Sequence, residues 1–389
     1  MQTAPKSITK MFAKFAASEQ SSAILLMICV LLALALANSP SSADYLGIWQ
    51  AKIGPLHLVH WINDGLMAVF FLLIGLELER ELYVGELSSF RNALLPIVAA
   101  VGGMAAPALI HLFFNAGSAT QSGFGIPMAT DIAIALGVLA LLGKRVPVAL
   151  KVFVVAYAVM DDLGAIVVIA IFYTAQLSVG YLTAALSIWA LLMLLNLRFR
   201  VMSLLPYLVG GALMWALMLK SGVHATIAGV LLAFAVPFST PEGASDSPSH
   251  RLENILHRPV AFLILPLFAL ANTGIVIGTN WLATLTSANS VGIAAGLLLG
   301  KPLGVLSLCA LATTVGVCRL PEGVSWGHIS GAAILGGIGF TMSIFMAGLA
   351  FSATPEILNA SKLATLLASA VAGIAGFAWL RVSETKVSR

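Results

Sequence analysis

The sequence has few charged residues. Only 9% of its 389 residues are Asp, Glu, Lys or Arg, whereas 60% are hydrophobic and the mean hydropathy is +1.01. Because soluble domains carry about 25% charged residues, this composition excludes a soluble enzyme and a nucleic-acid-binding protein. It predicts an all-α polytopic membrane protein whose surroundings are the lipid bilayer, and we attribute the net charge of +4 to topology rather than to a charged partner.

Cysteine is also scarce. The three cysteines, Cys29, Cys309 and Cys318, have no paired spacing. The sequence therefore predicts neither a disulfide framework nor a cysteine metal site, and nothing in it calls for a cofactor.

Long apolar runs are what the sequence does contain. They predict a single transmembrane domain over residues 20–381 with twelve spans, at about 20–38, 60–84, 93–115, 122–143, 148–174, 180–197, 203–219, 222–238, 256–278, 290–314, 326–350 and 357–381. Sixteen of the 20 Lys and Arg residues fall in the termini and in alternate loops, and only three fall in the opposite loops. By the positive-inside rule, both termini are expected in the cytoplasm.

The N-terminus has some features of a signal peptide. Three lysines precede an apolar run that ends in Ala35-Leu36-Ala37. The run is longer than a usual signal sequence and many spans follow it, so we interpret it as an uncleaved first helix. Residues 1–19 are expected to form a cytoplasmic amphipathic helix, because four of their apolar residues share one helical face, namely Ile8, Met11, Phe12 and Phe15. Residues 382–389 are expected to form a cytoplasmic tail.

Two loops stand out. Residues 44–59 form the longest outer loop and contain the turn signal Gly54-Pro55, which predicts either a small β-hairpin or a simple linker. Residues 239–249 are rich in Ser, Pro and Gly and are expected to form a flexible joint between two halves.

Two adjacent aspartates, Asp161 and Asp162, lie inside an apolar run from about residue 146 to 173. Lys151, the preceding charge, is ten residues earlier, which is roughly 15 Å along a helix and half of a hydrocarbon core. Each aspartate would cost about 2.5–3.5 kcal/mol at the bilayer centre, and residues retained at that cost are usually functional.

Two spans carry helix-breaking residues at membrane depth. Pro127 stands just before Thr130 and Asp131, and the eleventh span contains Gly336, Gly337 and Gly339. Pro127 alone would be consistent with a kinked packing helix, but the neighbouring aspartate favours a broken one. Two interrupted helices at matching positions predict an inverted-repeat transporter, with residues of about 93–174 pairing with about 290–381.

The tenth span contains a buried cation. Lys301 is about eleven residues into the span and needs an anionic partner, which could be Asp131, Asp161 or Asp162. Beside it, glycines recur at every fourth position from Gly292 to Gly304, a stripe that we expect to serve close helix packing.

A third group of charges is expected at the cytoplasmic mouth. These residues are ordinary solvated helix ends in the simplest interpretation. Because Glu77 lies within an apolar stretch and His257 titrates near neutrality, they are also candidates for an ion funnel and a pH response: Glu77, Arg80, Glu81, Arg251, Glu253 and His257.

Asp161 and Asp162 differ by about 100° around a helix, so one can meet Lys301 while the other faces a water-filled path. Carboxylates bind both hard cations such as Na⁺ or Li⁺ and protons, so competition between them predicts cation/proton exchange. One alternative is an intramembrane aspartyl protease, which needs two facing carboxylates and could use Asp131 with Asp161. Another is a passive cation channel, which needs a continuous polar pore.

The sequence resembles the bacterial NhaA-type sodium/proton antiporters from the first span to the last. The matching stretches are Trp61-Ile62-Asn63-Asp64, Gly75-Leu76-Glu77, Pro127-Met128-Ala129-Thr130-Asp131-Ile132-Ala133, Asp161-Asp162-Leu163-Gly164-Ala165, Lys220-Ser221-Gly222-Val223-His224-Ala225-Thr226, Gly300-Lys301-Pro302-Leu303-Gly304 and Gly336-Gly337-Ile338-Gly339-Phe340-Thr341-Met342-Ser343. The resemblance implies an electrogenic inner-membrane antiporter that expels Na⁺ or Li⁺ for more than one proton by alternating access, in the service of sodium and pH homeostasis. It also implies a homodimer formed through the hairpin at about residues 45–58.

The resemblance assigns roles to the membrane-buried charges. Asp161 and Asp162 would carry the cation and the protons. Asp131 with Thr130 would balance the positive ends of two crossing half-helices, and Lys301 would balance their negative ends and pair with Asp161 during the cycle.

Two departures from the family concern the pH response. Glu79 stands where well-known members carry a basic residue, and Asn254 stands where they carry a histidine. The resemblance implies activation at alkaline pH through this cytoplasmic region, and these two differences leave the pH threshold of this chain open.

Overall fold

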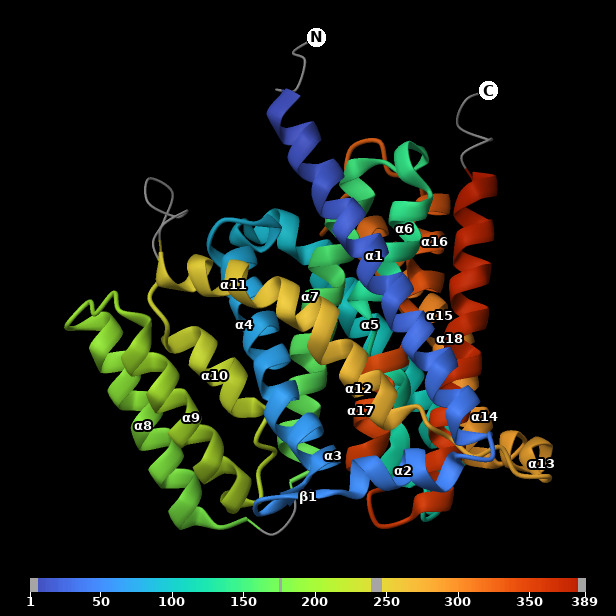
Figure 1. Cartoon of the computed structure of the whole chain (residues 1–389). Helices are drawn as coiled ribbons and strands as arrows, with labels where there is room; N and C mark the ends of the chain where they lie inside the picture. Colours follow the sequence, from blue (N-terminus) through green and yellow to red (C-terminus); the bar gives the residue numbers. More distant parts are fainter. Residues whose placement is uncertain (1–5, 175–176, 239–246, 384–389) are drawn as a thin grey trace. The chain divides into compact units, whose positions relative to one another are not determined.

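The computed structural model describes residues 6–174, 177–238 and 247–383, and for residues 6–19, Arg91 and Lys144 it describes the backbone alone. The segments 1–5, 239–246 and 384–389 lie outside it, so most of the expected joint and tail and the apolar face of the expected amphipathic helix are not described. The described chain is almost entirely helical, as the composition predicts (Figure 1). It divides into two compact units.

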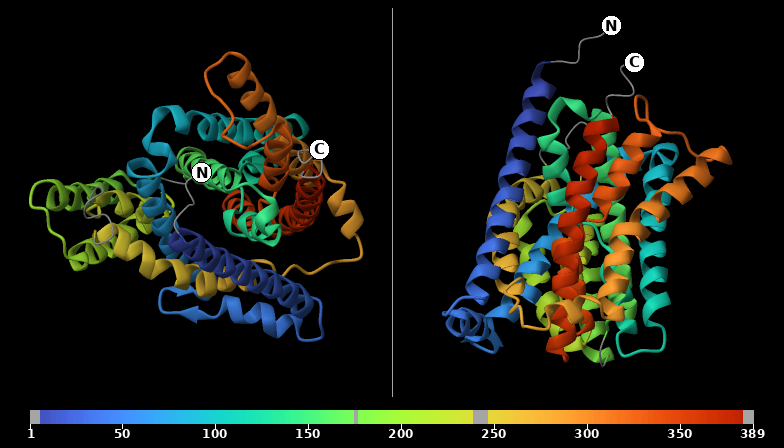
Figure 2. Two further views of the ribbon diagram at one scale, coloured as in Figure 1. Left: turned by 90° about the horizontal axis from the view of Figure 1, so that it is seen from above. Right: turned by 90° about the vertical axis from the view of Figure 1, so that its right-hand side faces the viewer.

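Unit 1 comprises Met1–Leu32, Leu94–Asp161 and Ile275–Arg389. Its elements are α1 (Lys6–Ala37) up to Leu32, α5 (Phe90–Asn115) from Leu94 on, η3 (Gln121–Met128), α6 (Ile132–Leu141), η4 (Gly143–Arg145), the first half of α7 (Val148–Phe172), α13 (Trp281–Leu285), α14 (Ala288–Ala295), η7 (Gly296–Gly300), α15 (Lys301–Thr314), α16 (Trp326–Gly336), α17 (Phe340–Ala350) and α18 (Pro355–Ser383). The beginning of α1 and the end of α18 lie at the same end of this unit (Figures 1 and 2).

Unit 2 comprises Ala33–Ala93 and Asp162–Gly274. Its elements are α2 (Ser42–Gln50), β1 (Lys52–Ile53), β2 (Leu56–His57), α3 (Leu58–His60), η1 (Trp61–Leu66), α4 (Met67–Tyr83), η2 (Glu86–Ser88), the second half of α7, α8 (Val179–Leu197), α9 (Leu204–Ser221), α10 (Ile227–Ala235), α11 (Pro248–Pro259), η6 (Val260–Ile264) and α12 (Leu265–Asn272). Leucine, methionine and alanine side chains from α4, α8, α9 and α10 form its core.

Among the described residues, ten helices are long and apolar enough to cross a membrane, or eleven when α16 and α17 count as one bent span. The chain is therefore a multi-pass membrane protein. The eighth expected span, 222–238, contains only α10, whose nine residues extend about 14 Å against a core of about 30 Å. Gly222 ends α9 in the left-handed region at φ 84°. The residues from there to the start of α10 at Ile227 form a turn, although their hydropathy places them in the expected span.

At its N-terminus, α1 is continuous from Lys6 to Ala37, so the expected surface helix and the first span form one helix. The outer loop does form a hairpin. Strands β1 and β2 are antiparallel and two residues long, and Gly54 takes the positive φ of 62° that the turn requires. Upstream of the hairpin, Leu46 and Ile48 lie in α2, so a helix rather than a longer strand leads into β1.

The glycine stripe of the tenth span serves packing, as predicted. A methyl group at Gly296 would come within 2.7 Å of Pro127, one at Gly300 within 2.8 Å of Pro107, and one at Gly304 would overlap the carbonyl of Gly102. The helix α14–η7–α15 therefore lies directly against α5, and it places Lys301 in the interior of unit 1.

Candidate functional site

Two interrupted helices meet at their breaks inside unit 1. The first break separates η3 from α6 at residues 129–131, and the second separates α16 from α17, which are bent by 42°, at Gly337-Ile338-Gly339. The backbone N–H of Asp131 donates to the carbonyl of Ile338 at 2.6 Å, and the hydroxyl of Ser343 donates to the carbonyl of Ile126 at 2.6 Å. Each break thus satisfies polar groups freed by the other, which confirms broken helices rather than kinks.

The Asp131 side chain joins the starts of two helices. Its Oδ1 accepts the backbone N–H of Ile134 at 3.1 Å and thereby caps α6. Its Oδ2 accepts both the backbone N–H of Thr341 at 3.1 Å and the Thr341 hydroxyl at 2.5 Å, in the first turn of α17. Asp131 is 3% exposed, so its side chain is buried at the N-terminal ends of both half-helices.

Lys301 lies on the other side of the same crossing. Its Nζ donates to Oδ2 of Asp161 at 2.6 Å and to Oγ1 of Thr130 at 2.9 Å. The Thr130 hydroxyl in turn donates to the carbonyl of Gly336, the last residue of α16, at 2.9 Å. Lys301 and Asp161 are both 0% exposed, so the ion pair is fully removed from water.

Of the aspartates that the sequence left open for Lys301, Asp161 forms an ion pair with it, whereas Asp131 binds Thr341. The Tyr157 ring also lies 5.8 Å from Lys301 Nζ, at cation–π distance. Oδ1 of Asp161 accepts no hydrogen bond from any described residue, so this buried carboxylate keeps acceptor capacity for a cation.

Asp162 follows on the same helix and is 1% exposed. The boundary between the two units falls between Asp161 and Asp162. Because neighbours on a helix differ by about 100°, the two carboxylates leave α7 in different directions.

The charged residues expected at the cytoplasmic mouth lie in unit 2. Arg80 binds Glu253 at 2.9 Å and Glu81 at 3.3 Å, and these ion pairs join the end of α4 to α11. Beside them, the carboxylate of buried Glu79 accepts the Ser249 hydroxyl at 2.8 Å. His250 completes the cluster at 3.5 Å from Glu253.

The ion pairs described above include Arg80, Glu81 and Glu253 of the predicted mouth residues. Glu77 and His257 are half-buried elsewhere on the same two helices, and Arg251 is exposed. Sequence reasoning missed Ser249 and His250 as members, because it assigned Ser249 to a flexible joint.

Thr341 and Tyr157 were also not predicted as parts of the crossing. Thr341 directly follows the glycine-rich break, and Tyr157 lies one helical turn before Asp161. These positions are the signals that could have found them. Neither Asp131 nor Asp161 uses its carboxylate oxygens as an aspartyl protease would, because one binds Thr341 and the other binds Lys301.

Comparison with known proteins gives a consistent result. The family described as Na⁺/H⁺ antiporter 1 matches residues 13–380. The chain is 64% identical to the Na⁺/H⁺ antiporter NhaA of Dechloromonas aromatica, over 96% of each chain. It is 53% identical to NhaA of Cytophaga hutchinsonii, over 97% of this chain and 96% of that one, and 54% identical to NhaA 1 of Flavobacterium johnsoniae, over 96% and 97%. The chain therefore belongs to the Na⁺/H⁺ antiporter 1 family.

Proposed function

We propose that this protein is an electrogenic secondary transporter that expels Na⁺ or Li⁺ in exchange for protons by alternating access. The observation that carries the proposal is the fully buried ion pair between Lys301 and Asp161, held against Thr130 at the crossing of two broken helices. Family membership supports the exchange of Na⁺ for H⁺. A cofactor plays no part in this exchange.

The buried ion pair between Lys301 and Asp161 suggests how Na⁺ and protons compete for the same site. While Lys301 is an ammonium bound to Asp161, one negative charge of the site is already neutralised and a cation has little to gain there. When Lys301 gives up its proton or changes partner, the Asp161 carboxylate is freed. Na⁺ then binds oxygens from Asp161 and Asp162, which are hard ligands suited to it.

The same two carboxylates explain the proposed electrogenicity. In the opposite half of the cycle, protons return to the site, the Lys301 ammonium pairs with Asp161 again, and the sodium ion is expelled. If more than one proton enters for each Na⁺ that leaves, net positive charge moves inward. Alternating access would move the two repeats, at about 93–174 and 290–381, against the remaining helices.

Several finer assignments belong to this proposal. We place the protein in the bacterial inner membrane with both termini in the cytoplasm, because basic residues gather at the termini and in alternate loops. The cluster around Arg80 and Glu253 would set the pH response. A second copy of the chain would bind through the β1–β2 hairpin, on which Ile53 is exposed.

The decisive experiment measures Na⁺-driven proton movement in everted membrane vesicles with a dye that reports the pH gradient. Addition of Na⁺ or Li⁺ should dequench the dye for the wild type, and Asp161→Asn and Asp162→Asn should abolish the response while the protein remains folded in the membrane. Asp44→Asn is the matched control, because Asp44 is an exposed aspartate on α2, and it should behave as wild type. A full response from Asp162→Asn would move the cation site elsewhere, and no response from the wild type at any pH would contradict antiport.

A further inference from the structure

The helix that carries Lys301 is interrupted by a single π-turn. The segment η7 lies between α14 and α15, and the backbone N–H of Lys301 donates to the carbonyl of Gly296, five residues earlier. In an α-helix the same N–H would donate to the carbonyl of Leu297, four residues earlier. A π-turn therefore holds one residue more than an α-helical turn, and such turns are rare and frequent at functional sites. This one ends directly before the lysine of the buried ion pair.

A proline accounts for the place of this π-turn. Pro302 has no N–H, and its ring excludes the carbonyl of Leu298 from the position that a regular helix gives it. The same arrangement occurs a second time, in unit 2. There the N–H of Leu265 donates to the carbonyl of Val260 and closes η6, and Pro266 is the next residue. Two π-turns that each close at the residue before a proline indicate that the proline fixes where the turn forms.

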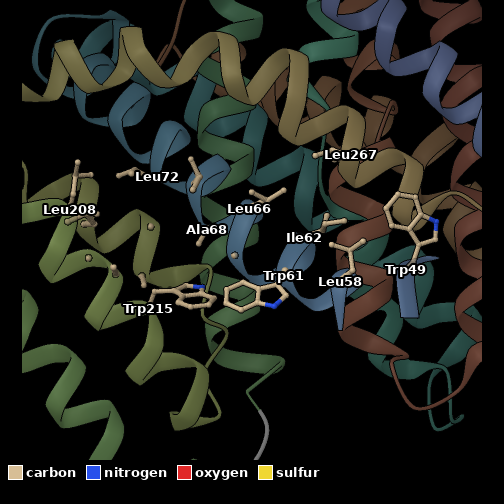
Figure 3. A pocket seen from close by; sticks show the side chains of 17 residues that line it. Trp49, Leu58, Trp61, Ile62, Leu66, Ala68, Leu72, Leu208, Trp215 and Leu267 are labelled. Carbon is tan, nitrogen blue, oxygen red and sulfur yellow. The ribbon is translucent and has the colours of Figure 1, made fainter. Parts of the chain in front are cut away.

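The third π-turn of the described chain, η1, is held in another way. No proline follows it within the span Leu58–Tyr83. Instead, the indole N–H of Trp215 donates to the carbonyl of Asp64 inside the turn at 2.9 Å, and the Trp215 ring stacks on Trp61 (Figure 3). The π-turns of this chain are thus fixed either by a following proline or by a contact from another helix.

The extra residue of η7 keeps the glycine stripe on one face of its helix. Each α-helical residue turns by about 100°, so every fourth residue drifts by about 40°, which makes about 120° from Gly292 to Gly304. One extra residue in a turn takes back about 100° and leaves a drift of about 20°. A methyl carbon added to any of the four glycines would indeed lie within 3.2 Å of an atom of α5. The π-turn therefore sets the rotation of α15, and with it the direction of Lys301.

The π-turn also directs a carbonyl toward the break between α16 and α17. The carbonyl of Leu297 loses its α-helical donor, the N–H of Lys301, and the next residue, Pro302, has no N–H to offer. A methyl group at Gly337 would come within 2.5 Å of this oxygen, and one at Gly339 within 3.0 Å of the Leu297 side chain. Leu297 is 0% exposed and occupies the space beside both glycines. The start of η7 is therefore held against the break, which fixes one end of the turn.

We propose that Pro302 is a positioning residue of the cation site. By fixing the π-turn, it rotates α15 so that Nζ of Lys301 reaches both Asp161 and Thr130. With an α-helical turn, and with Leu297 still held against the break, the lysine would point about 100° away from them. The effect of Pro302 on Na⁺ rests on the proposed function, whereas its effect on the ion pair does not.

Thermal unfolding of the purified protein in detergent tests the positioning without any transport. Lys301→Met is introduced into the wild type and into Pro302→Ala. Because alanine returns an N–H and favours helix, Pro302→Ala should remain folded and monodisperse. The fall in melting temperature that Lys301→Met causes should shrink to less than about half in the Pro302→Ala background, since the ion pair is no longer formed there. Pro266→Ala, the matched change after η6, should leave that fall unchanged.

A deletion separates positioning from a general loss of packing. An α-helical turn in Pro302→Ala contains one residue too many, and deleting the exposed Leu299 removes it. The deletion turns all later residues back by about 100°, which is the rotation that the π-turn supplies. Pro302→Ala with the deletion should therefore regain the full effect of Lys301→Met on the melting temperature. The deletion alone, with Pro302 in place, should lose it.

Na⁺ connects the positioning to exchange. In Pro302→Ala the Asp161 carboxylate lacks its competing ammonium, so the half-maximal rise in melting temperature should need less Na⁺ than in the wild type, whereas Pro266→Ala should match the wild type. An unchanged effect of Lys301→Met in Pro302→Ala would overturn the proposal, and so would a Leu299 deletion that fails to restore the effect or the fold. A wild type that does not respond to Na⁺, with the Lys301→Met results as expected, would contradict the proposed function and leave Pro302 as a positioning residue of the ion pair.

Discussion

Removing one partner of the Lys301–Asp161 ion pair should destabilise the protein strongly, whereas removing both should not. In Lys301→Met, the carboxylate of Asp161 remains in a fully buried position with its 2.6 Å partner gone. In Asp161→Asn, the ammonium keeps Thr130 as a hydrogen-bond acceptor but loses its counter-charge. The double variant contains neither charge and places two groups of similar volume in the same space.

The magnitudes follow from burial. Breaking a buried ion pair by removing one partner costs about 3–5 kcal/mol, while replacing both partners is often neutral or stabilising. With an unfolding entropy of about 2.1 cal/mol/K per residue, the whole chain has about 0.8 kcal/mol/K, so each single variant should melt about 4–6 °C lower. The double variant should melt near the wild type, which corresponds to a coupling energy of about 6–10 kcal/mol.

Thermal unfolding of the purified protein in detergent at pH 7, without Na⁺ and with K⁺ as the only added alkali cation, measures all four proteins of the cycle. Lys52→Met and Asp44→Asn repeat the same chemical changes at exposed positions and should leave the melting temperature unchanged. Na⁺ should then raise the melting temperature of Lys301→Met more than that of the wild type, because its Asp161 carboxylate is free to bind the cation. Single variants that melt with the wild type, or a double variant whose loss equals the sum of both, would refute this reasoning.

Three further predictions concern the frame around the site. Gly304→Ala should cost about 1–3 kcal/mol of stability, because its methyl would overlap the carbonyl of Gly102, whereas Gly348→Ala, with open space around it, should cost nothing; equal melting temperatures would contradict the close packing. Thr341→Val removes the hydroxyl that donates to the carboxylate capping α6 and should cost about 1–3 kcal/mol, with Thr341→Ser restoring most of the stability; failure of that rescue would assign the loss to packing. Burial lowers the pKa of His224 below its ordinary 6.5, so on acidification the unfolded chain takes up the proton before the folded chain does. The contribution of His224 to stability should therefore be complete above about pH 6.5 and fall below it. Melting temperatures measured from about pH 5 to 7.5 should depend less on pH in His224→Gln than in the wild type.

Sequence reasoning located the residues of the site whose burial in a membrane costs free energy. Charges and helix breakers inside apolar runs are expensive in a membrane, so Asp161, Lys301, Asp131 and the Gly336–Gly339 break stood out without any structure. The number of spans was less certain, because hydropathy cannot distinguish a nine-residue helix with turns at its ends from a full crossing. In the structure, residues 222–238 contain the nine-residue helix α10 with a turn before it, so this expected span is not one continuous long helix.

What could not be predicted is which of these groups meet. Three aspartates were open to Lys301, and the choice depends on how the helix α14–η7–α15 rotates against α5, which the glycine stripe permits but does not specify. The partners of Glu79 and Arg80 lie about 170 residues away in α11, close to a loop without any periodic pattern. Such contacts depend on tertiary packing, and periodicity along one helix contains no information about them.

The geometry of the first break links cation exchange to the helices that cross there. Thr130 and Asp131 are neighbours in an extended segment, and they bind to opposite sides of the second break. Asp131 holds the start of α17 through Thr341, whereas Thr130 connects the last carbonyl of α16 to the ammonium of Lys301.

Lys301 therefore interacts with the carboxylate of Asp161 directly and with the C-terminal end of α16 through the Thr130 hydroxyl. In the proposed cycle, a sodium ion that binds Asp161 would remove the first of these two contacts, while Asp131 would still lie at the starts of α6 and α17. The electrostatic balance at the crossing would then change on the α16 side when the bound ion changes. We infer that the end of α16, rather than the start of α17, is where exchange at Asp161 acts on the fold.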